Sequence, residues 1–151
     1  MIYVIIIGAN IFGYFITVTG LPDALVNGLS QLAMPNGVII FLTLFIYLIL
    51  GSLFDELAAM LVTLPFVLPI IISMGYSTVW WGIINVVVIE LGMITPPIGM
   101  NVFVLYGVIG NKVPLGTIYR GVMPFVLADV VRLSLLAFFP VLSLWLPRLL
   151  S

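Results

Sequence analysis

The feature that most restricts the fold of this chain is a series of long apolar segments with almost no charge. Four of them cover residues 1–19, 37–54, 57–74 and 122–147. A helix needs about 20 apolar residues to cross the hydrocarbon core of a bilayer. Only 6% of the residues are charged, whereas soluble domains average about 25%. We therefore expect an all-α integral membrane protein whose main solvent is lipid.

The chain contains no histidine and no cysteine, and their absence narrows its chemistry. Without cysteine it has no thiolate nucleophile and no disulfide or iron–sulfur site, and without histidine it lacks the commonest general base and metal ligand. Only speculative Ser–Asp or Ser–Lys pairs remain for catalysis. The sequence therefore predicts a protein that is not an enzyme and holds no cofactor. A net charge of -1 offers no basic surface for nucleic acid.

Polar residues between the apolar segments divide the chain into the parts of one transmembrane unit, residues 1–151. We predict a transmembrane helix at 1–19, an interfacial helix or loop at 20–36, a helical hairpin at 37–74, a broken transmembrane helix at 79–109, a polar connection at 110–121 and a last transmembrane helix at 122–147. Trp80 and Trp81 suit the headgroup level of the bilayer, where aromatic residues are enriched. Lys112 and Arg120 favour a cytoplasmic location for the polar connection.

The tip of the predicted hairpin is polar. Gly51, Ser52 and Asp55 place a glycine, a hydroxyl and a carboxylate together where the apolar run is interrupted. In one architecture both legs cross the membrane and these residues form an external turn. In the other the hairpin is re-entrant and its tip stops inside the bilayer. Hydropathy does not distinguish the two.

The most informative segment is Glu-Leu-Gly-Met-Ile-Thr-Pro-Pro-Ile-Gly-Met-Asn at residues 90–101. A Pro-Pro pair flanked by glycines cannot continue a helix, because proline lacks an N–H group and clashes with the preceding turn. The helix at 79–109 is therefore expected to break near Thr95, at about the middle of the membrane. Irregular backbone at that depth is tolerated only inside protein or beside a wet cavity.

Oxygen atoms around this break suit a hard cation such as Na⁺. Glu90, Thr95, Asn101 and unwound carbonyl groups supply possible ligands. The positive end of the half-helix that begins near Ile98 suits an anionic group of a substrate. The alternative is a kinked structural helix in which Glu90 is protonated or pairs with Arg132.

Other polar residues in apolar segments have structural interpretations. Asp129 and Arg132 are three positions apart on one helix, a spacing that predicts a local ion pair. Asn10 and Asn85 are expected to form hydrogen bonds between helices.

The segment at residues 90–104 resembles the Thr-Pro-Pro segment of the large membrane (M) subunit of TRAP transporters, the tripartite ATP-independent periplasmic transporters. Residues 51–55, followed by an apolar run with Pro65 and Pro69, resemble the second hairpin of that family. Residues 116–124 and the closing Leu-Ser-Leu-Trp-Leu-Pro resemble its last helix and C-terminus. The resemblance covers essentially the whole chain.

The resemblance implies a Na⁺-coupled symporter in the bacterial inner membrane that imports organic acids such as C4-dicarboxylates, 2-oxoacids or sialic acid. It implies one inverted-repeat half of an elevator-type transporter, with a re-entrant hairpin at 37–74 and a Pro-Pro-broken helix at 79–109. The implied partners are a periplasmic substrate-binding protein, a small membrane subunit, the N-terminal repeat of the large subunit and the bilayer. A full large subunit is much longer, so we expect the C-terminal repeat of a split or partial protein that does not transport alone.

Spacing and resemblance together define candidate residues for binding substrate or ion. They are Gly51, Ser52, Asp55, Glu90, Gly92, Thr95, Pro96, Pro97, Gly99 and Asn101. Asp55 and Thr95 are the candidates for Na⁺, the coupling ion. Two alternatives to the function remain: a related elevator-type dicarboxylate or citrate carrier without a binding protein, and a structural membrane subunit with no site of its own.

Overall fold

The structure is a computed structural model that describes residues 2–31 and 34–150. Every regular element in these ranges is helical, so the all-α prediction is confirmed. The elements are α1 (Ile2–Val18), α2 (Leu21–Gln31), α3 (Asn36–Leu53), α4 (Glu56–Ser73), α5 (Thr78–Ile94), α6 (Met100–Ile109), the 3-10 turn η1 (Gly110–Lys112), α7 (Leu115–Phe138) and α8 (Pro140–Leu150). Residues 1, 32 and 33 of the first two predicted segments lie outside the described residues.

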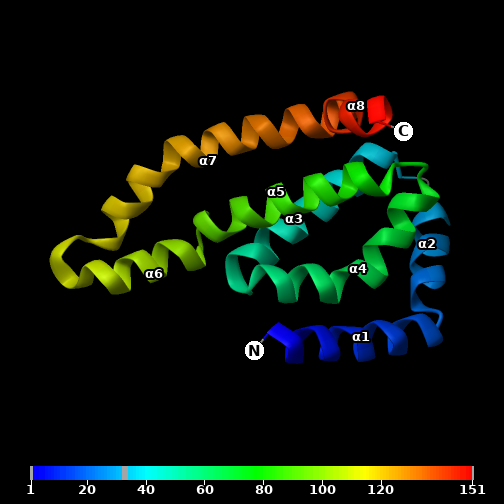
Figure 1. Ribbon diagram of the computed structural model, residues 1–151, viewed down its shortest axis with the longest axis horizontal. Coiled ribbons are helices and arrows are strands. Elements are labelled where there is room, and N and C mark those ends of the chain that lie inside the picture. The colour runs from blue at the N-terminus through cyan, green and yellow to red at the C-terminus, as the bar shows by residue number, and fades with distance from the viewer. Residues whose placement is uncertain (1, 32–33, 151) are drawn as a thin grey trace.

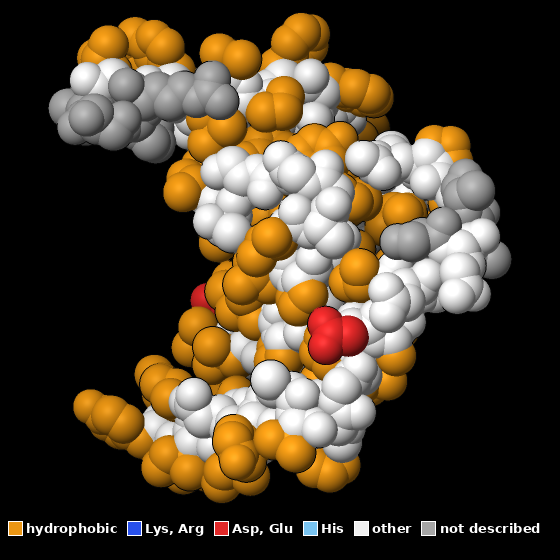
Figure 2. Space-filling model, turned by 90° about the vertical axis from the view of Figure 1, so that its right-hand side faces the viewer, with side chains coloured by type: hydrophobic (Ala, Val, Ile, Leu, Met, Phe, Trp, Pro, Cys, Tyr) orange, Lys and Arg blue, Asp and Glu red, His pale blue; other side chains and the backbone are white. Residues whose placement is uncertain are grey.

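Three helices, α3, α4 and α7, are long and apolar enough to cross a membrane. A fourth candidate span is α1 together with the first part of α2, which are bent by 62°. Few side chains of α4 and α7 are buried, and Figure 2 shows a face with many hydrophobic and few charged side chains. Lipid is the medium that such a surface fits. The chain is therefore a multi-pass membrane protein.

The helices are arranged around α5. Helix α3 lies along one side of α5, and α7 runs beside both α5 and α6 (Figure 1). Helix α4 folds back from the end of α3, and α1 and α2 pack against α4. The two helices that follow the hairpin, α5 and α6, are separated by residues 95–99.

The hydrophobic core lies between α3, α4 and α5 and extends along α5 from Trp80 to Ile89. Its buried members are Ile40, Tyr47, Ile71, Trp80, Trp81, Ile84, Val88 and Ile89. Trp80 and Trp81 are 0% and 1% exposed, so their rings lie inside the protein and do not face lipid, while their level in the bilayer stays a prediction. The Trp80 indole donates to the carbonyl of Leu136 at 2.9 Å. Both side chains are buried because other helices surround α5. A pair of tryptophans after a turn looks the same in the sequence whether it faces the bilayer or the protein core.

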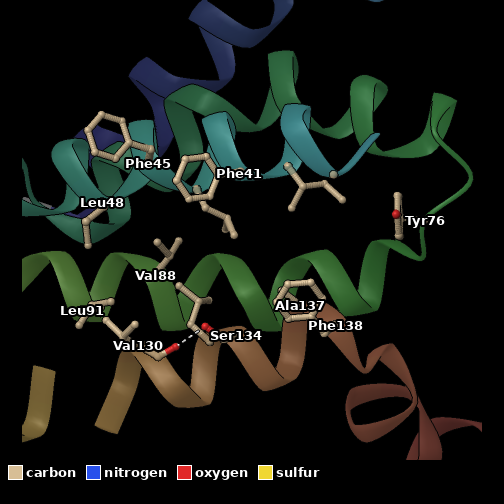
Figure 3. A pocket seen from close by; sticks show the side chains of 14 residues that line it. Phe41, Phe45, Leu48, Tyr76, Val88, Leu91, Val130, Ser134, Ala137 and Phe138 are labelled. Carbon is tan, nitrogen blue, oxygen red and sulfur yellow. Dashed lines mark hydrogen bonds between the residues drawn. The ribbon is translucent and has the colours of Figure 1, made fainter. Parts of the chain in front are cut away.

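An apolar cavity of about 380 Å³ lies between α3, α5 and α7. Figure 3 shows Phe41 and Leu48 of α3, Val88 of α5 and Val130 of α7 around it. The hydroxyl of Ser134 donates to the Val130 carbonyl and leaves the cavity without a free donor from that group. Helices α3 and α7 are thus both in contact with α5 but are not packed tightly against each other here.

The last long helix begins earlier than predicted. The polar connection expected at residues 110–121 contains η1, and α7 starts at Leu115, just after Pro114. The fixed φ of proline suits a position at the start of a helix. Hydropathy located the polar residues correctly, but polar side chains outside the apolar zone do not interrupt a helical backbone.

The same helix also ends earlier than predicted. Helix α7 stops at Phe138, and a separate helix, α8, begins at Pro140. Proline cannot donate an N–H group to a preceding turn, and it disfavours helical backbone in the residue before it. Phe139 accordingly has a non-helical ψ of 74°. The single span predicted at 122–147 is therefore divided between two helices.

Candidate functional site

Helices α3 and α5 approach each other closely at Gly51 and Gly92, a contact that we call the glycine crossing. A Cβ atom on Gly92 would lie 2.7 Å from the carbonyl oxygen of Leu48 and 2.8 Å from the carbonyl carbon of Gly51. A Cβ atom on Gly51 would lie 2.8 Å from the carbonyl oxygen of Ile89. Small residues permit such close backbone approach between membrane helices. Packing therefore explains why glycine stands at both positions.

The glycine crossing places two irregular segments at the same end of this helix pair. Gly51 lies shortly before the turn at residues 54–55, which we call the hairpin tip. Gly92 lies shortly before residues 95–99, which we call the helix break. Figure 1 shows the end of α3 and the end of α5 close together. The structure thus brings together the two segments that the sequence marked as polar interruptions.

Asp55 at the hairpin tip caps helix α4. Its Oδ1 accepts hydrogen bonds from the backbone N–H groups of Leu57 at 3.1 Å and Ala58 at 3.3 Å. A carboxylate at this position satisfies N–H groups that have no partner within the helix and interacts favourably with its dipole. The side chain is exposed, and within residues 2–31 and 34–150 its Oδ2 has no protein partner. One oxygen of Asp55 is thus structural and the other is open to a ligand.

Ser52, beside the crossing, is 1% exposed. Its hydroxyl donates to the carbonyl of Ile49 at 2.8 Å, within its own helix. This bond uses the donor of Ser52, so only the lone pairs of its oxygen remain for a ligand.

The helix break begins at Thr95, which follows the last residue of α5 and caps that helix. Its N–H donates to the carbonyl of Gly92 at 3.1 Å, and its hydroxyl donates to the carbonyl of Leu91 at 2.5 Å. Pro96 and Pro97 follow, joined by a cis peptide bond, and both are exposed. Neither proline has an N–H group to donate, so the backbone in this segment offers mainly carbonyl oxygens.

Gly99 closes the helix break and precedes the first residue of α6. Its φ is 58°, in the left-handed region that favours glycine. A Cβ atom there would also lie 3.1 Å from the carbonyl oxygen of Thr95. The role of Gly99 is therefore to turn the chain back into a helix within a very short segment.

Tyr119 was missed by the sequence analysis, although it contacts the helix break directly. Its hydroxyl, on α7, donates to the carbonyl oxygen of Ile98. The residue lies in the segment that was expected to be a polar connection, and the two partners are 21 positions apart. A lone tyrosine at the start of an apolar helix has no motif that could have revealed this contact.

Glu90 faces α7 and not the hairpin. Its Oε2 lies 3.5 Å from Nη2 of Arg132, and the same nitrogen lies 3.1 Å from Oδ1 of Asp129. The predicted local pair of Asp129 with Arg132 is therefore confirmed. Of the roles that the sequence left open for Glu90, the structure contains the ion pair with Arg132.

Asn101 and Asn10 are both exposed but lie on different helices. Asn101 is exposed in the first turn of α6, next to the helix break. Asn10 is also exposed and donates to the carbonyl of Ile6 at 2.8 Å in its own helix. The prediction that Asn10 bonds another helix is wrong, because its side chain is long enough to reach back one turn and lies on the outer side of α1.

The oxygen atoms near the hairpin tip and the helix break suit coordination of an alkali cation better than of a transition metal. In the described part of the chain, no group of three or more His, Cys, Asp or Glu side chains could hold a metal ion. The available oxygens belong to backbone carbonyls, the hydroxyls of Ser52 and Thr95, and the carboxylate of Asp55. Unwound carbonyls and helix C-terminal ends are the ligands that Na⁺ finds in many secondary transporters.

Comparison with known proteins identifies the family. Residues 1–142 match the family described as Tripartite ATP-independent periplasmic transporter, DctM component. The chain belongs to this family. Membership confirms the resemblance that was based on the Thr-Pro-Pro segment.

Several large permease proteins are similar to this DctM-family chain over nearly its whole length. The C4-dicarboxylate TRAP transporter large permease of Vibrio cholerae is 35% identical over 152 residues, which are 99% of this chain and 33% of that protein. The corresponding protein of Pseudomonas aeruginosa is 31% identical over 148 residues, 98% of this chain and 34% of that protein. The sialic acid TRAP transporter large permease of Vibrio cholerae is 29% identical over 149 residues, 99% of this chain and 34% of that protein. The DctM-family chain thus spans about a third of the length of these relatives, all of which are transport proteins.

Proposed function

We propose that this chain is the C-terminal part of the large permease subunit of a Na⁺-coupled TRAP transporter that imports an organic acid. The observation that carries the proposal is the glycine crossing, because it holds the hairpin tip beside the helix break. Discontinuous segments that meet inside the membrane form the substrate and ion sites of many secondary transporters. The names of the relatives favour a C4-dicarboxylate or sialic acid as substrate.

The crossing also supports a re-entrant hairpin. Because the apolar helix α6 continues beyond the helix break, we infer that the break lies within a membrane span and not at its end. The hairpin tip lies at the same level, because Gly51 contacts Gly92. Backbone of this kind inside a membrane has to be covered by protein or line a wet cavity. A tip that stops within the membrane, beside the substrate, satisfies this requirement.

Within this site we assign the anionic substrate and the Na⁺ ion to different groups of the protein. The N-terminus of α6, beside the helix break, presents a positive dipole end that suits the carboxylate of the substrate, whereas the N-terminus of α4 is already capped by Asp55. The carbonyl groups at the end of α5, the hydroxyl of Thr95 and the free oxygen of Asp55 suit Na⁺. Movement of the hairpin and the broken helix as one body would give the elevator mechanism.

The proposed partners follow from the family and from the length of the chain. They are the remainder of the large subunit, a small membrane subunit and a periplasmic substrate-binding protein in the bacterial inner membrane. A tripartite family favours such a system over a carrier that works without a binding protein.

Uptake by the complete transporter tests the proposal. The large subunit containing this chain is reconstituted into proteoliposomes with its small subunit, and labelled C4-dicarboxylate or sialic acid is supplied on its binding protein. We expect uptake with an inward Na⁺ gradient, none with choline in place of Na⁺, and none from vesicles that contain this chain alone. Equal uptake in Na⁺ and in choline would exclude Na⁺ coupling.

A structural membrane subunit with no site of its own is the second candidate function. It is favoured by the observation that capping explains Asp55 and packing explains both glycines of the crossing. The substitution Asp55→Asn separates the two, because asparagine is also a good helix cap but carries no charge. Unchanged Na⁺ dependence of uptake in this variant would favour the structural role.

A further inference from the structure

The core between α3, α4 and α5 contains two buried polar atoms that have no partner in the described part of the chain. They are Nε1 of Trp81, a donor, and Oδ1 of Asn85, an acceptor. Both residues are on α5, and they are only 1% and 3% exposed. Buried polar atoms are nearly always hydrogen-bonded, so two such atoms in one core need an explanation.

Tyr47 on α3 connects these two residues. Its ring packs edge-on against the ring of Trp81, with centroids 5.8 Å apart. Its hydroxyl is paired with the hydroxyl of Thr63 on α4 and faces the side chain of Asn85. Trp81 and Asn85 are four positions apart, so they lie on one face of α5. The residues that carry the unpaired donor and the unpaired acceptor therefore both lie beside Tyr47, which defines one site among three helices.

We infer that this site holds a water molecule between Trp81 and Asn85. Water accepts a hydrogen bond from the indole N–H and donates one to the amide oxygen at the same time. A cation would bind the amide oxygen but would face the positive hydrogen of the indole. The oxygen of the Tyr47 hydroxyl provides a further partner, and buried waters typically make about 3 hydrogen bonds. The bound water links α3 to α5 through hydrogen bonds and adds to the direct contact at the glycine crossing.

This water site is separate from the proposed transport site. Asn85 lies about two turns before Gly92 on α5, inside the hydrophobic core and away from the hairpin tip and the helix break. The inference consequently does not depend on the proposed function, and it is tested by properties of the chain other than transport.

The indole N–H signals provide a direct test by NMR. The full chain, labelled with ¹⁵N, contains three tryptophans, and each indole signal is assigned by substitution with phenylalanine. We expect a cross-relaxation peak between the Trp81 indole proton and a long-lived water. Trp80 is the internal control, because its indole already donates to the Leu136 carbonyl at 2.9 Å. An assigned Trp81 signal without a water peak, in the unsubstituted chain, would overturn the inference.

Thermal unfolding of Asn85→Leu provides a second test. If water fills the site, this variant leaves the Trp81 N–H unpaired, so the Tm falls by roughly 3 °C. Asn10→Leu is the matched control, because Asn10 is exposed and bonds only its own helix. A Na⁺-dependent Tm that is lost in Asn85→Leu would identify a cation in place of water and would also overturn the inference.

Discussion

The two sides of α5 are packed in different ways. Toward α3 the contact is backbone against backbone, at Gly51 and Gly92, with no room for a single additional carbon atom. Toward α7 the contact is made by side chains, and an apolar cavity of about 380 Å³ remains between α3 and α7. The α3 side therefore has one permitted geometry, whereas the α7 side permits adjustment by rotation of side chains.

The polar contacts of α7 lie at three levels of the broken helix, and the first is the hydrogen bond from the Trp80 indole to the Leu136 carbonyl near the start of α5. Arg132 pairs with Glu90 before the helix break, and Tyr119 bonds the carbonyl of Ile98 inside the break. Each of these bonds adds to a long helix–helix contact and no single one of them determines it. The difference teaches that α3 and α5 behave as one unit, while α7 positions that unit through contacts that are replaceable one at a time.

Gly92→Ala has the largest expected effect, because it disturbs the close backbone contact between α3 and α5. The added Cβ would meet backbone atoms at 2.7–2.9 Å that cannot move independently. We expect a loss of at least about 3 kcal/mol in the free energy of unfolding, at the upper end of overpacking effects. Thermal unfolding of the purified chain in detergent measures it.

Gly82→Ala is the matched control on the same helix, since nothing lies within 4 Å of its added Cβ. Alanine is the better helix former, so this control is expected to be neutral or stabilising by up to about 1 kcal/mol. Equal destabilisation by both variants would show that the crossing is not a close contact.

Arg132→Gln tests the α7 side. The change leaves the carboxylates of Glu90 and Asp129 without their cation, so we expect a loss of about 2 kcal/mol in the free energy of unfolding. Glu90→Gln is the matched control, because Arg132 keeps Asp129 as its partner and the amide still accepts a hydrogen bond. A larger loss in the free energy of unfolding for Glu90→Gln than for Arg132→Gln would contradict this prediction.

Tyr119→Phe removes only the hydroxyl that bonds the Ile98 carbonyl. We expect a loss of about 1 kcal/mol in the free energy of unfolding, the usual net value of one hydrogen bond. In the complete transporter, the Na⁺ concentration for half-maximal uptake should rise, because the helix break is less firmly positioned. Tyr14→Phe is the control, since Tyr14 is 75% exposed on α1. An unchanged Na⁺ dependence would limit Tyr119 to a role in stability.

Asp55→Asn has the smallest expected effect on folding. Asparagine caps a helix about as well as aspartate, so the free energy of unfolding should change by only a few tenths of a kcal/mol, while Asp55→Ala should cost about 1 kcal/mol. Uptake at low Na⁺ should nevertheless fall in the asparagine variant, because the charge is lost. A variant that unfolds early but transports normally once folded would contradict this assignment.

The residues at the tip and the break illustrate what could be predicted. The Pro-Pro pair predicts an end to a helix because proline removes a donor and clashes with the preceding turn, and α5 does end just before Pro96. The role of Gly51 and Gly92 could not be predicted in the same way, because the atoms that exclude a Cβ belong to another helix. Both glycines were selected as candidate ligands, and the structure shows that they pack.

Trp81 and Tyr119 are two further residues whose contacts could not be predicted from the sequence. A tryptophan after a turn is typical of a membrane interface and equally typical of a core, and only the presence of α3 over α5 buries Trp81. Tyr119 gains its partner because α7 returns beside the helix break, which no local pattern encodes.

The sequence by itself determined the membrane setting, the family, the break at the Pro-Pro pair and the absence of thiol and imidazole chemistry. These properties depend on composition and on the covalent geometry of single residues, which do not change with the surroundings. Only the tertiary structure decided that the hairpin tip lies beside the helix break, that Glu90 pairs with Arg132 and that α7 starts at Leu115. Such features depend on which helices meet, and the free energy of those contacts is shared between residues far apart in the chain.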